Sequence, residues 1–429
     1  MPDWTISATG HDPVPARSLV PQIPPGLSMR PRRTIMLTGT DQRCLAVAAQ
    51  TALHTGHQVV LPHTAATLKV PAGLHLHLTA DPDAPRIRQI PGSCVRDNWD
   101  IALFSSGTTG RPRGYGFTRE QIATVTGWYE TIYQVTGDSV IVTALPVSYN
   151  WTFVAGVMLA ARLGARLHLS SSVPHVLDDA AAAASAADRV IVLANPVVLD
   201  QAAHLWGMPA NITIDSGGAP LGTSAIIEYR SHGIDIREGY GLTETASLTH
   251  FDSAATAASL GTVGTPMPSV QTTITLQDSR PVIGLTSPAI GVPLDPCEPH
   301  TPTRLRTTDL GRLDEHQQLR LLGRSDDHPI AGHWPRDTLD LLGPVLGRRC
   351  AQIRHTASDE VAIKLLTPAP PHTALAIIDR AAEALDLPRH HIALTHQSGP
   401  LLPTLKLPNR RPGQQPAART FIGQGRWNA

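Results

Sequence analysis

Lysine is scarce in this chain of 429 residues: it occurs only at Lys69, Lys364 and Lys406, so arginine carries nearly all of the positive charge. The 35 basic residues are balanced by 35 acidic ones. A net charge of zero argues against nucleic acid or an anionic membrane as the main partner, because both attract a basic surplus. Since lysines are so few, one at a mechanistically sensible position carries weight.

Cysteine is also sparse, and long apolar runs are missing. Cys44, Cys94, Cys297 and Cys350 lie far apart without a CxxC pair. This spacing argues against a disulfide framework or a thiolate zinc site and predicts a reducing compartment. The amino terminus lacks the pattern of a signal peptide, and the longest apolar stretch, 153–161, is shorter than the ~18 residues of a membrane span. We therefore expect a cytoplasmic protein without a membrane segment.

Hydrophobic residues make up 41% of the chain and charged residues 16%, so a large core can form and the length suits two or three domains. From residue 33, short apolar strands alternate with helices. Strands are expected at 34–37, 58–61, 101–104, 140–145, 166–169 and 189–193, and helices at 41–54, from 119, at 152–163 and at 178–187. This alternation predicts an α/β fold whose parallel sheets are covered by helices on both faces.

The pattern changes twice further along the chain. After Gly261, short strands such as 272–276 and 319–321 are separated by turns and predict a small barrel-like or antiparallel sheet. After Arg324 the tail is mixed α+β, and its clearest helix is expected at 374–385.

These changes predict two domains. A large amino-terminal domain would span residues 1–325, and a small, mobile carboxy-terminal domain would span residues 326–429. Residues 1–32 are rich in proline and are expected to form an irregular arm.

The most informative segment is the glycine- and hydroxyl-rich run 105–114, Ser-Ser-Gly-Thr-Thr-Gly-Arg-Pro-Arg-Gly, between the strand at 101–104 and the helix from 119. Its glycines let the backbone approach an anion closely, and its hydroxyls and N–H groups can surround phosphate oxygens. No Gly-Lys-Ser/Thr follows, so an ordinary kinase or P-loop NTPase is disfavoured.

This run resembles the phosphate loop of the adenylate-forming superfamily, which includes acyl- and aryl-CoA synthetases, peptide-synthetase adenylation domains and luciferases. Further segments match the family's motifs in order: 217–220, 239–245, 261–264, 308–311, 323–327 and 400–406. The resemblance spans roughly residues 33–415 and, because the region before the loop is short, implies a compact and divergent member with the family's hinged tail domain.

The resemblance implies that ATP and Mg²⁺ are used. The implied ATP-binding residues are Ser105, Ser106, Gly107, Thr108, Thr109, Gly110, Arg113, Gly218, Ala219, Pro220, Gly239, Tyr240, Gly241, Asp309 and Arg324. Among them Tyr240 would stack on adenine, and Asp309, assisted by Arg324, would accept the ribose hydroxyls. Arg113 stands where the family usually has lysine, which preserves the charge.

The same resemblance implies three catalytic residues, Thr243, Glu244 and Lys406. Thr243 would contact the α-phosphate, and Glu244 would bind Mg²⁺, which prefers oxygen ligands. Lys406 would bridge the carboxylate and the α-phosphate with its compact ammonium group, neutralising charge where two anions meet. Leu405 replaces the glycine that usually precedes this lysine.

The implied acid pocket contains five residues: Tyr149, Asn150, Trp151, Ser216 and Gly217. Tyr149 occupies a position where many relatives carry histidine. A packed core pair of Tyr149 and Trp151 is the competing interpretation.

Asp326 matches the position at which the family pivots its small domain. The segment 326–335, which lines the thiol channel in the family, fits the family pattern poorly because it contains an extra proline and Trp334.

We therefore predict an ATP-dependent ligase that converts a small, aromatic or unsaturated carboxylic acid to its acyl-AMP and passes the acyl group to a thiol, either CoA or a carrier protein. Two alternatives remain open. A diazotase of the same superfamily would activate nitrite for attack by an aryl amine, which suits the shortened large domain and the altered thiol channel. A nucleotide-binding protein without catalysis would suit Leu405. The identity of the acid, the final nucleophile and the oligomeric state are left open.

Overall fold

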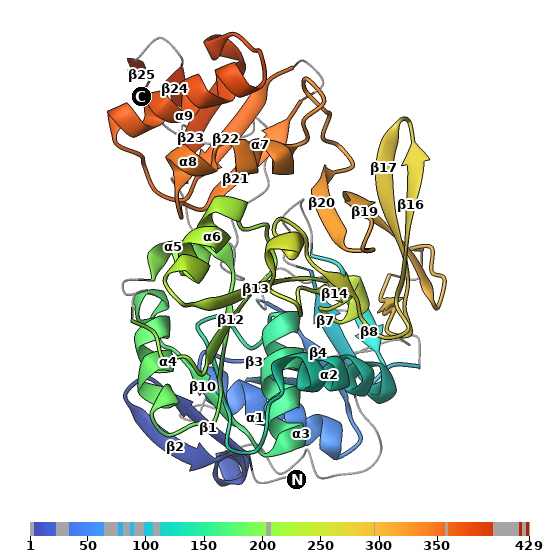
Figure 1. Cartoon of the computed structure of the whole chain (residues 1–429). Coiled ribbons are helices and arrows are strands. Elements are labelled where there is room, and N and C mark those ends of the chain that lie inside the picture. Colours follow the sequence, from blue (N-terminus) through green and yellow to red (C-terminus); the bar gives the residue numbers. More distant parts are fainter. Residues whose placement is uncertain are drawn as a thin grey trace.

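The computed structural model describes residues 4–22, 34–63, 76–79, 86–89, 98–105, 112–202, 207–295, 297–356, 359–397, 420–422 and 426–428. These residues form two large sheets, a smaller antiparallel sheet and a carboxy-terminal sheet with its own helices (Figure 1). The mixed α/β fold predicted from the sequence is confirmed. None of the described helices is long and apolar enough to cross a membrane.

The larger sheet has nine strands and contributes most of the site. In spatial order they are β15 (Thr265–Pro266), β14 (His250–Phe251), β13 (Asp235–Tyr240), β12 (Ile212–Ser216), β11 (Val190–Ala194), β9 (Val140–Thr143), β10 (Arg166–Leu169), β1 (Thr5–Ala8) and β2 (His11–Pro15). The strands from β13 to β1 run parallel. β9, β11 and β12 are buried at every position, as expected for parallel strands covered on both faces.

The second large sheet has seven strands and carries the phosphate-loop motif. In spatial order they are β18 (Val292–Pro293), β8 (Gly114–Phe117), β7 (Ile101–Phe104), β4 (Gln58–Leu61), β3 (Thr34–Thr38), β5 (Leu76–Thr79) and β6 (Arg86–Gln89). β7, β4, β3 and β5 run parallel, whereas β8 pairs with β7 in the antiparallel direction.

Helices connect and cover these two sheets. They are α1 (Gln42–His54), α2 (Arg119–Tyr133), the π-helical turn η4 (Thr152–Met158), α3 (Leu159–Leu163), α4 (Val176–Ala184), α5 (Pro196–Gln201) and α6 (Thr223–Ser231). One continuous hydrophobic core includes residues of both sheets and of these helices, so the two sheets form a single packed body.

Capping side chains explain where several helices start and stop. Asp41 accepts hydrogen bonds from the backbone N–H groups of Arg43 and Cys44, at 2.8 and 3.2 Å, which starts α1 where the sequence predicted. α4 ends at Ala184 rather than at the expected Ala187, and the amide of Asn211 donates to the carbonyl oxygens of both residues.

The prediction of an irregular arm is wrong for residues 4–22. β1 and β2 are strands, followed by the 3₁₀ helix η1 (Ala16–Gln22). The side chains of Trp4 and Ile6 are fully buried, and β1 pairs in parallel with β10, which continues the nine-stranded sheet (Figure 1). The alternation of apolar and polar residues from Trp4 to Ala8 specifies this strand, although the many prolines that follow suggested irregular structure.

The predicted small β-sheet is confirmed as a four-stranded antiparallel sheet. Its strands are β16 (Gln271–Gln277), β17 (Arg280–Thr286), β19 (Arg304–Leu313) and β20 (Leu319–Arg324). Asp278 and Ser279, which join β16 to β17, both have positive φ, as a tight two-residue hairpin turn requires.

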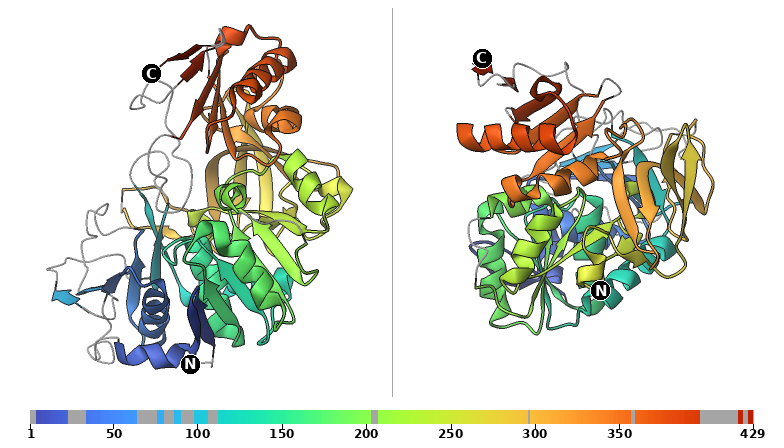
Figure 2. Two further views of the ribbon diagram at one scale, coloured as in Figure 1. Left: turned by 90° about the vertical axis from the view of Figure 1, so that its left-hand side faces the viewer. Right: turned by 45° about the horizontal axis from the view of Figure 1, so that its top comes forward.

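The tail has its own sheet and core. Its strands are β21 (Ala351–His355), β22 (Val361–Leu365), β23 (Ile392–His396), β24 (Thr420–Ile422) and β25 (Arg426–Asn428), and its helices are α7 (Pro335–Leu341), α8 (Gly343–Leu346) and α9 (Pro371–Ala384). The cluster of buried side chains from Ile330 to Leu394 is separate from the main core. The tail lies at the opposite end of the molecule from β1 and β2 (Figure 2).

Short 3₁₀ turns complete the described structure. They are η5 (Val173–His175), η6 (Thr243–Thr245), η7 (Ala257–Ser259) and η8 (Arg389–His391). η6 begins three residues after the end of β13 and carries two of the predicted catalytic residues, Thr243 and Glu244.

Candidate active site

The two ends of the predicted phosphate loop are held together. The backbone N–H of Ser105 donates to the Arg113 carbonyl oxygen at 2.8 Å, and the Arg113 N–H donates to the Ser105 hydroxyl at 2.9 Å. Residues 106–111 between them, including the predicted Ser106, Gly107, Thr108, Thr109 and Gly110, lie outside the described residues. The loop leads into β8, a strand that was not predicted, and the expected helix from Arg119 follows as α2. The loop therefore joins two antiparallel strands.

The carboxyl ends of β12 and β13 bring several predicted residues to one edge of the nine-stranded sheet. Gly217 is buried directly after β12, and Gly218, Ala219 and Pro220 follow it as exposed residues. Gly239 and Tyr240 end the adjacent strand β13. The carboxyl edge of a parallel sheet is the usual place for a ligand site in α/β proteins.

Tyr240, Asp309 and Arg324 form one hydrogen-bonded cluster between β13, β19 and β20. The Tyr240 hydroxyl donates to one Asp309 carboxylate oxygen at 2.9 Å, and the Arg324 guanidinium donates to the other at 2.7 Å. Arg324 also donates to the Thr308 hydroxyl at 2.7 Å. Burial, and then the nearby Asp309 carboxylate, raises the pKa of Tyr240 well above its ordinary value. Three predicted ATP-binding residues from distant parts of the chain thus meet at one place.

Glu244 is half-buried on η6 and faces Tyr115 of β8. Burial raises the pKa of the Glu244 carboxyl, and a hydrogen bond from the Tyr115 hydroxyl partly opposes this shift. Arg113, which is largely exposed, lies 3.4 Å from Glu298, and that carboxylate raises the pKa of the guanidinium. Arg113 of the predicted phosphate loop and Glu244, the predicted Mg²⁺ ligand, therefore lie near each other, on either side of Tyr115 in the sequence of contacts. Thr243, next to Glu244, is also half-buried.

No cluster of three or more His, Cys, Asp or Glu side chains suited to a metal occurs in the described part of the chain. The predicted Mg²⁺ ligand Glu244 is a single carboxylate. Such a site is compatible with Mg²⁺, which commonly binds one or two carboxylates and keeps the phosphate oxygens and water as its other ligands.

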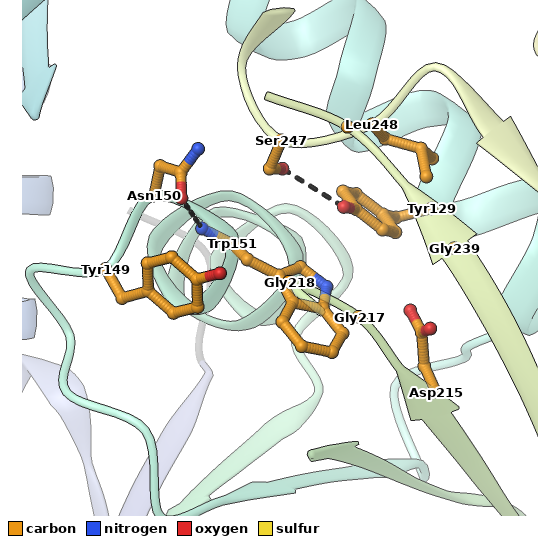
Figure 3. A pocket seen from close by; sticks show the side chains of 11 residues that line it. Tyr129, Tyr149, Asn150, Trp151, Asp215, Gly217, Gly218, Gly239, Ser247 and Leu248 are labelled. Atoms are coloured by element: carbon orange, nitrogen blue, oxygen red, sulfur yellow. Dashed lines mark hydrogen bonds between the residues drawn. The ribbon is translucent and has the colours of Figure 1, made fainter. Parts of the chain in front are cut away.

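A pocket opens between α2, η4 and the carboxyl ends of β12 and β13 (Figure 3). Its lining residues are Tyr129, Tyr149, Asn150, Trp151, Asp215, Gly217, Gly218, Gly239, Gly241, Ser247 and Leu248. Four of the five residues predicted for the acid pocket are among them. The fifth, Ser216, is buried beside the pocket without lining it.

Tyr149 and Trp151 pack against each other and also line the pocket. The Tyr149 and Trp151 rings meet edge to face, with centroids 6.4 Å apart, and both side chains are buried. The Asn150 carboxamide oxygen accepts a hydrogen bond from the Trp151 backbone N–H at 2.9 Å (Figure 3). The core interpretation and the pocket interpretation of this pair are therefore compatible.

Sequence reasoning missed the polar residues that line the other side of the pocket. Asp215 lies on β12 and is 1% exposed, and the Tyr133 hydroxyl of α2 donates to its Oδ2 atom. The Tyr129 hydroxyl and the Ser247 hydroxyl are 3.0 Å apart. Burial raises the pKa of Asp215 to about 7, against the opposing effect of the Tyr133 hydrogen bond. The signal in the sequence was the carboxylate of Asp215 in the short run Ile212–Ser216, which two glycines follow directly.

One glycine of this region is required by sterics. A Cβ atom on Gly241 would lie 2.0 Å from the carbonyl oxygen of Ser247, so no other residue fits without moving the backbone. Gly241 thereby allows the chain to turn from β13 into η6 with Ser247 packed against it.

An arginine of the tail contacts the predicted hinge. Arg354 of β21 contacts Asp326 at 2.7 Å and Asp327 at 2.6 Å. Asp327 also accepts the backbone N–H of Arg324 at 2.7 Å. The predicted Lys406 lies outside the described residues. That Asp326 acts as a pivot stays a prediction.

A second contact between the tail and the main body is a buried ion pair. Arg336 of α7 contacts Glu238 of β13 at 3.4 Å, and both side chains are 4% exposed. Arg336 also contacts Asp340 at 3.4 Å, and Asp340 accepts the backbone N–H of Thr223 at 2.9 Å. This network fixes how α7 sits against β13 and α6.

Comparisons with known proteins agree with these motifs. Residues 33–284 match the family described as AMP-binding enzyme. Among curated proteins, the 3-[(3aS,4S,7aS)-7a-methyl-1,5-dioxo-octahydro-1H-inden-4-yl]propanoyl:CoA ligase of Mycobacterium tuberculosis is 28% identical over 252 residues, which cover 54% of this chain and 47% of that protein. The match therefore spans about half the length of this relative.

Solved structures share the fold over nearly the whole chain. O-succinylbenzoate CoA synthetase (MenE) from Bacillus subtilis, in complex with AMP, aligns with a TM-score of 0.74 at 18% identity, covering 97% of this chain and 96% of that one. MatB from Rhodopseudomonas palustris, bound to ATP, aligns at 0.71 and 16% identity, covering 93% of both chains. The amide bond synthetase McbA from Marinactinospora thermotolerans aligns at 0.70 and 17% identity, covering 95% of this chain and 96% of that one.

Proposed function

Because this chain belongs to the AMP-binding enzyme family, we propose that it is an ATP-dependent, AMP-forming ligase that activates a small carboxylic acid with an aromatic or unsaturated body. Support comes from the family match, from the CoA ligase among its relatives and from neighbours whose structures contain ATP, AMP or an acyl-adenylate. The proposal rests above all on the arrangement of residues at the end of β13.

Consecutive residues at the end of β13 and directly after it face two neighbouring predicted sites. Gly239 and Gly241 line the aromatic pocket, and Tyr240 between them donates to Asp309 in the cluster with Arg324. Since alternate residues of a strand point to opposite faces, one stretch of backbone separates the predicted nucleotide site from the predicted acid site. An acid and a nucleotide bound on its two sides would be held next to each other, which is what bond formation between them requires.

In the proposed reaction a carboxylate oxygen of the substrate attacks the α-phosphorus of ATP. The bond from this phosphorus to the oxygen that bridges to the β-phosphate breaks, and pyrophosphate leaves with that electron pair. Asp309 and Arg324 would hold the ribose, and Lys406 would stabilise charge at the α-phosphate. When bound, Mg²⁺ would neutralise triphosphate charge, with Glu244 as its protein ligand.

The second step would transfer the acyl group from AMP to a nucleophile. Relatives named as CoA ligases favour a thiol, either CoA or a carrier-protein phosphopantetheine. Because one structural neighbour is named as an amide bond synthetase, any assay should also test an amine as the acyl acceptor.

The test is ATP–pyrophosphate exchange with a panel of small aromatic and unsaturated acids, followed by detection of AMP in separate reactions with CoA, an amine, or nitrite plus an aryl amine. We expect acid-dependent exchange and AMP formation, with thioester in the CoA arm. ADP in place of AMP, or no turnover with any acid, would overturn the proposal. Product that depends on nitrite would instead identify a diazotase.

A pair of variants tests the predicted lysine. Lys406→Ala should reduce exchange by at least about 100-fold, because it removes the charge that meets two anions in the transition state. The matched control is Lys364→Ala, which removes the other tail lysine, on β22. Equal activity of the two variants would remove Lys406 from the mechanism.

A further inference from the structure

The acid pocket contains a buried carboxylate with an unused hydrogen-bonding atom. Asp215 is 1% exposed, and its Oδ2 atom accepts the Tyr133 hydroxyl. Its Oδ1 atom is buried and has no hydrogen-bond partner among the described residues. Buried polar atoms are nearly always paired, so this oxygen points to a partner that arrives with a ligand.

The surroundings of Oδ1 leave room for such a partner. Gly239, on the neighbouring strand, lines the same pocket, and a Cβ atom there would lie 3.4 Å from Oδ1. The absence of a side chain on Gly239 therefore keeps the space beside this oxygen open. In Figure 3, Asp215 lies away from Asn150, with the Trp151 ring between them.

A purely structural role accounts for the Oδ2 atom of Asp215 but not for its Oδ1 atom. Holding Tyr133 in place uses Oδ2 and would be served equally well by an asparagine, which is not penalised by burial of a charge. The charges on Arg237 and Glu238 act in opposite directions on the pKa of Asp215. A ligand that donates a hydrogen bond to Oδ1 would favour the ionised carboxylate, which burial otherwise disfavours.

We propose that Asp215 determines substrate specificity by accepting a hydrogen bond from a hydroxyl or amino group on the acid. The substrate class is then a hydroxy- or amino-substituted carboxylic acid, with its apolar body against Tyr149 and Trp151. This inference rests on the proposed function, because it assigns one wall of the acid pocket. It also provides a reason for placing a carboxylate in a strand that is buried at every position.

The test compares benzoate with its 3- and 4-amino, 3- and 4-hydroxy, and 3- and 4-nitro derivatives in ATP–pyrophosphate exchange and in calorimetric binding. For the wild type we expect the best amino or hydroxy acid to be favoured over benzoate roughly 10- to 100-fold in kcat/KM, the range of a hydrogen bond to a charged group. Nitro acids, which offer only acceptors, should be the poorest.

Asp215→Asn is the informative variant. Its amide oxygen can still accept from Tyr133, which leaves its NH₂ group facing the pocket as a donor. We expect the preference for amino and hydroxy acids to disappear and nitro acids to gain. The matched control is Asp179→Asn: Asp179 of α4 also accepts a hydroxyl hydrogen bond, from Thr9 at 2.8 Å, but does not line the pocket. The control should keep the wild-type preferences.

A second variant serves if Asp215→Asn does not fold. Gly239→Ala fills the space beside Oδ1 and should reduce binding of substituted acids more than binding of benzoate. Wild-type indifference to the substituents, or preferences left unchanged by Asp215→Asn, would overturn this inference while acid-dependent exchange upheld the proposed function. If none of the acids supports exchange but calorimetry shows the expected preferences, the proposed function is rejected and the assignment of Asp215 is kept.

Discussion

The buried ion pair of Glu238 and Arg336 allows the loss of unfolding free energy in an Arg336 variant to be worked out. Their closest atoms are 3.4 Å apart, and each side chain is 4% exposed. Removing one partner of a buried ion pair usually costs about 3–5 kcal/mol, because the remaining charge is left without compensation. Since 3.4 Å is longer than a short charge-assisted hydrogen bond, we expect Arg336→Met to cost about 3 kcal/mol at pH 8.

The double variant separates the pair from the rest of the network. Leu221 donates its backbone N–H to Glu238 at 3.0 Å, and Glu238→Gln preserves an acceptor for that bond. Adding Glu238→Gln to Arg336→Met removes the charge left without compensation, because Asp340, the other partner of Arg336, still contacts Arg320 at 2.9 Å. Most of the lost stability should therefore return. Replacing a buried pair with neutral groups is often neutral or better.

The pH dependence of the single variant gives a further check. Burial already raises the pKa of Glu238 in the presence of Arg336. Without the arginine, the folded-state pKa rises further above the unfolded value, so the folded protein holds this proton more tightly and stability falls as pH increases from about 4.5 through the raised pKa. The cost of Arg336→Met should therefore be smaller at pH 5 than at pH 8.

Urea unfolding monitored by tryptophan fluorescence measures these differences. The matched control is Arg348→Met, which breaks the pair between Arg348 and Glu228, also at 3.4 Å but about one third exposed. An exposed pair contributes about 0–1 kcal/mol. Equal costs for Arg336→Met and Arg348→Met, or a double variant no more stable than the single one, would refute the reasoning.

Three further predictions concern the site. Gly241→Ala should lower the melting temperature and abolish exchange, because its Cβ atom would overlap the Ser247 carbonyl oxygen, whereas Gly127→Ala, with open space around it, should not. Asp309→Asn should raise the KM for ATP about tenfold or more and remove discrimination against 2′,3′-dideoxy-ATP, since it weakens the predicted ribose acceptor; unchanged discrimination would contradict that role. Because the pKa of Asp215 is raised from 3.8 to about 7, the folded state binds this proton more tightly. The wild type should then lose up to about 4 kcal/mol relative to Asp215→Asn between pH 4 and pH 7, at about 1.4 kcal/mol per pKa unit, and parallel stability profiles would contradict this.

Short, fully buried strands were the easiest elements to predict. The bounds of 58–61 and 101–104 agree with β4 and β7, because each is a short, fully buried run in which apolar residues dominate. β8 escaped prediction, since Gly114–Phe117 contains two glycines and its strand conformation depends on pairing with β7. β1 was missed because nearby prolines outweighed its short alternating pattern.

Some residues of the candidate site could likewise be predicted from the sequence, and others could not. Tyr240, Asp309 and Arg324 could be named from motifs, and the structure brings them together through contacts among three strands. Asp215 and Tyr133 could not, because their significance depends on a contact between residues 82 positions apart in the sequence. Motifs identify residues that recur in a family, whereas the wall that selects a particular ligand depends on packing that is specific to this chain.

The pairing of β1 with β10 has a consequence for biosynthesis. Ser7 and His168, which are adjacent in this pair and hydrogen-bonded at 2.8 Å, are 161 positions apart. β1 can pair early with β2, which follows it at once, but its other edge must wait unpaired until β10 has been translated. Such distant pairings form slowly, and an unpaired strand is a template for aggregation. Nascent chains stalled before residue 166 should consequently be the species that depends most on chaperones.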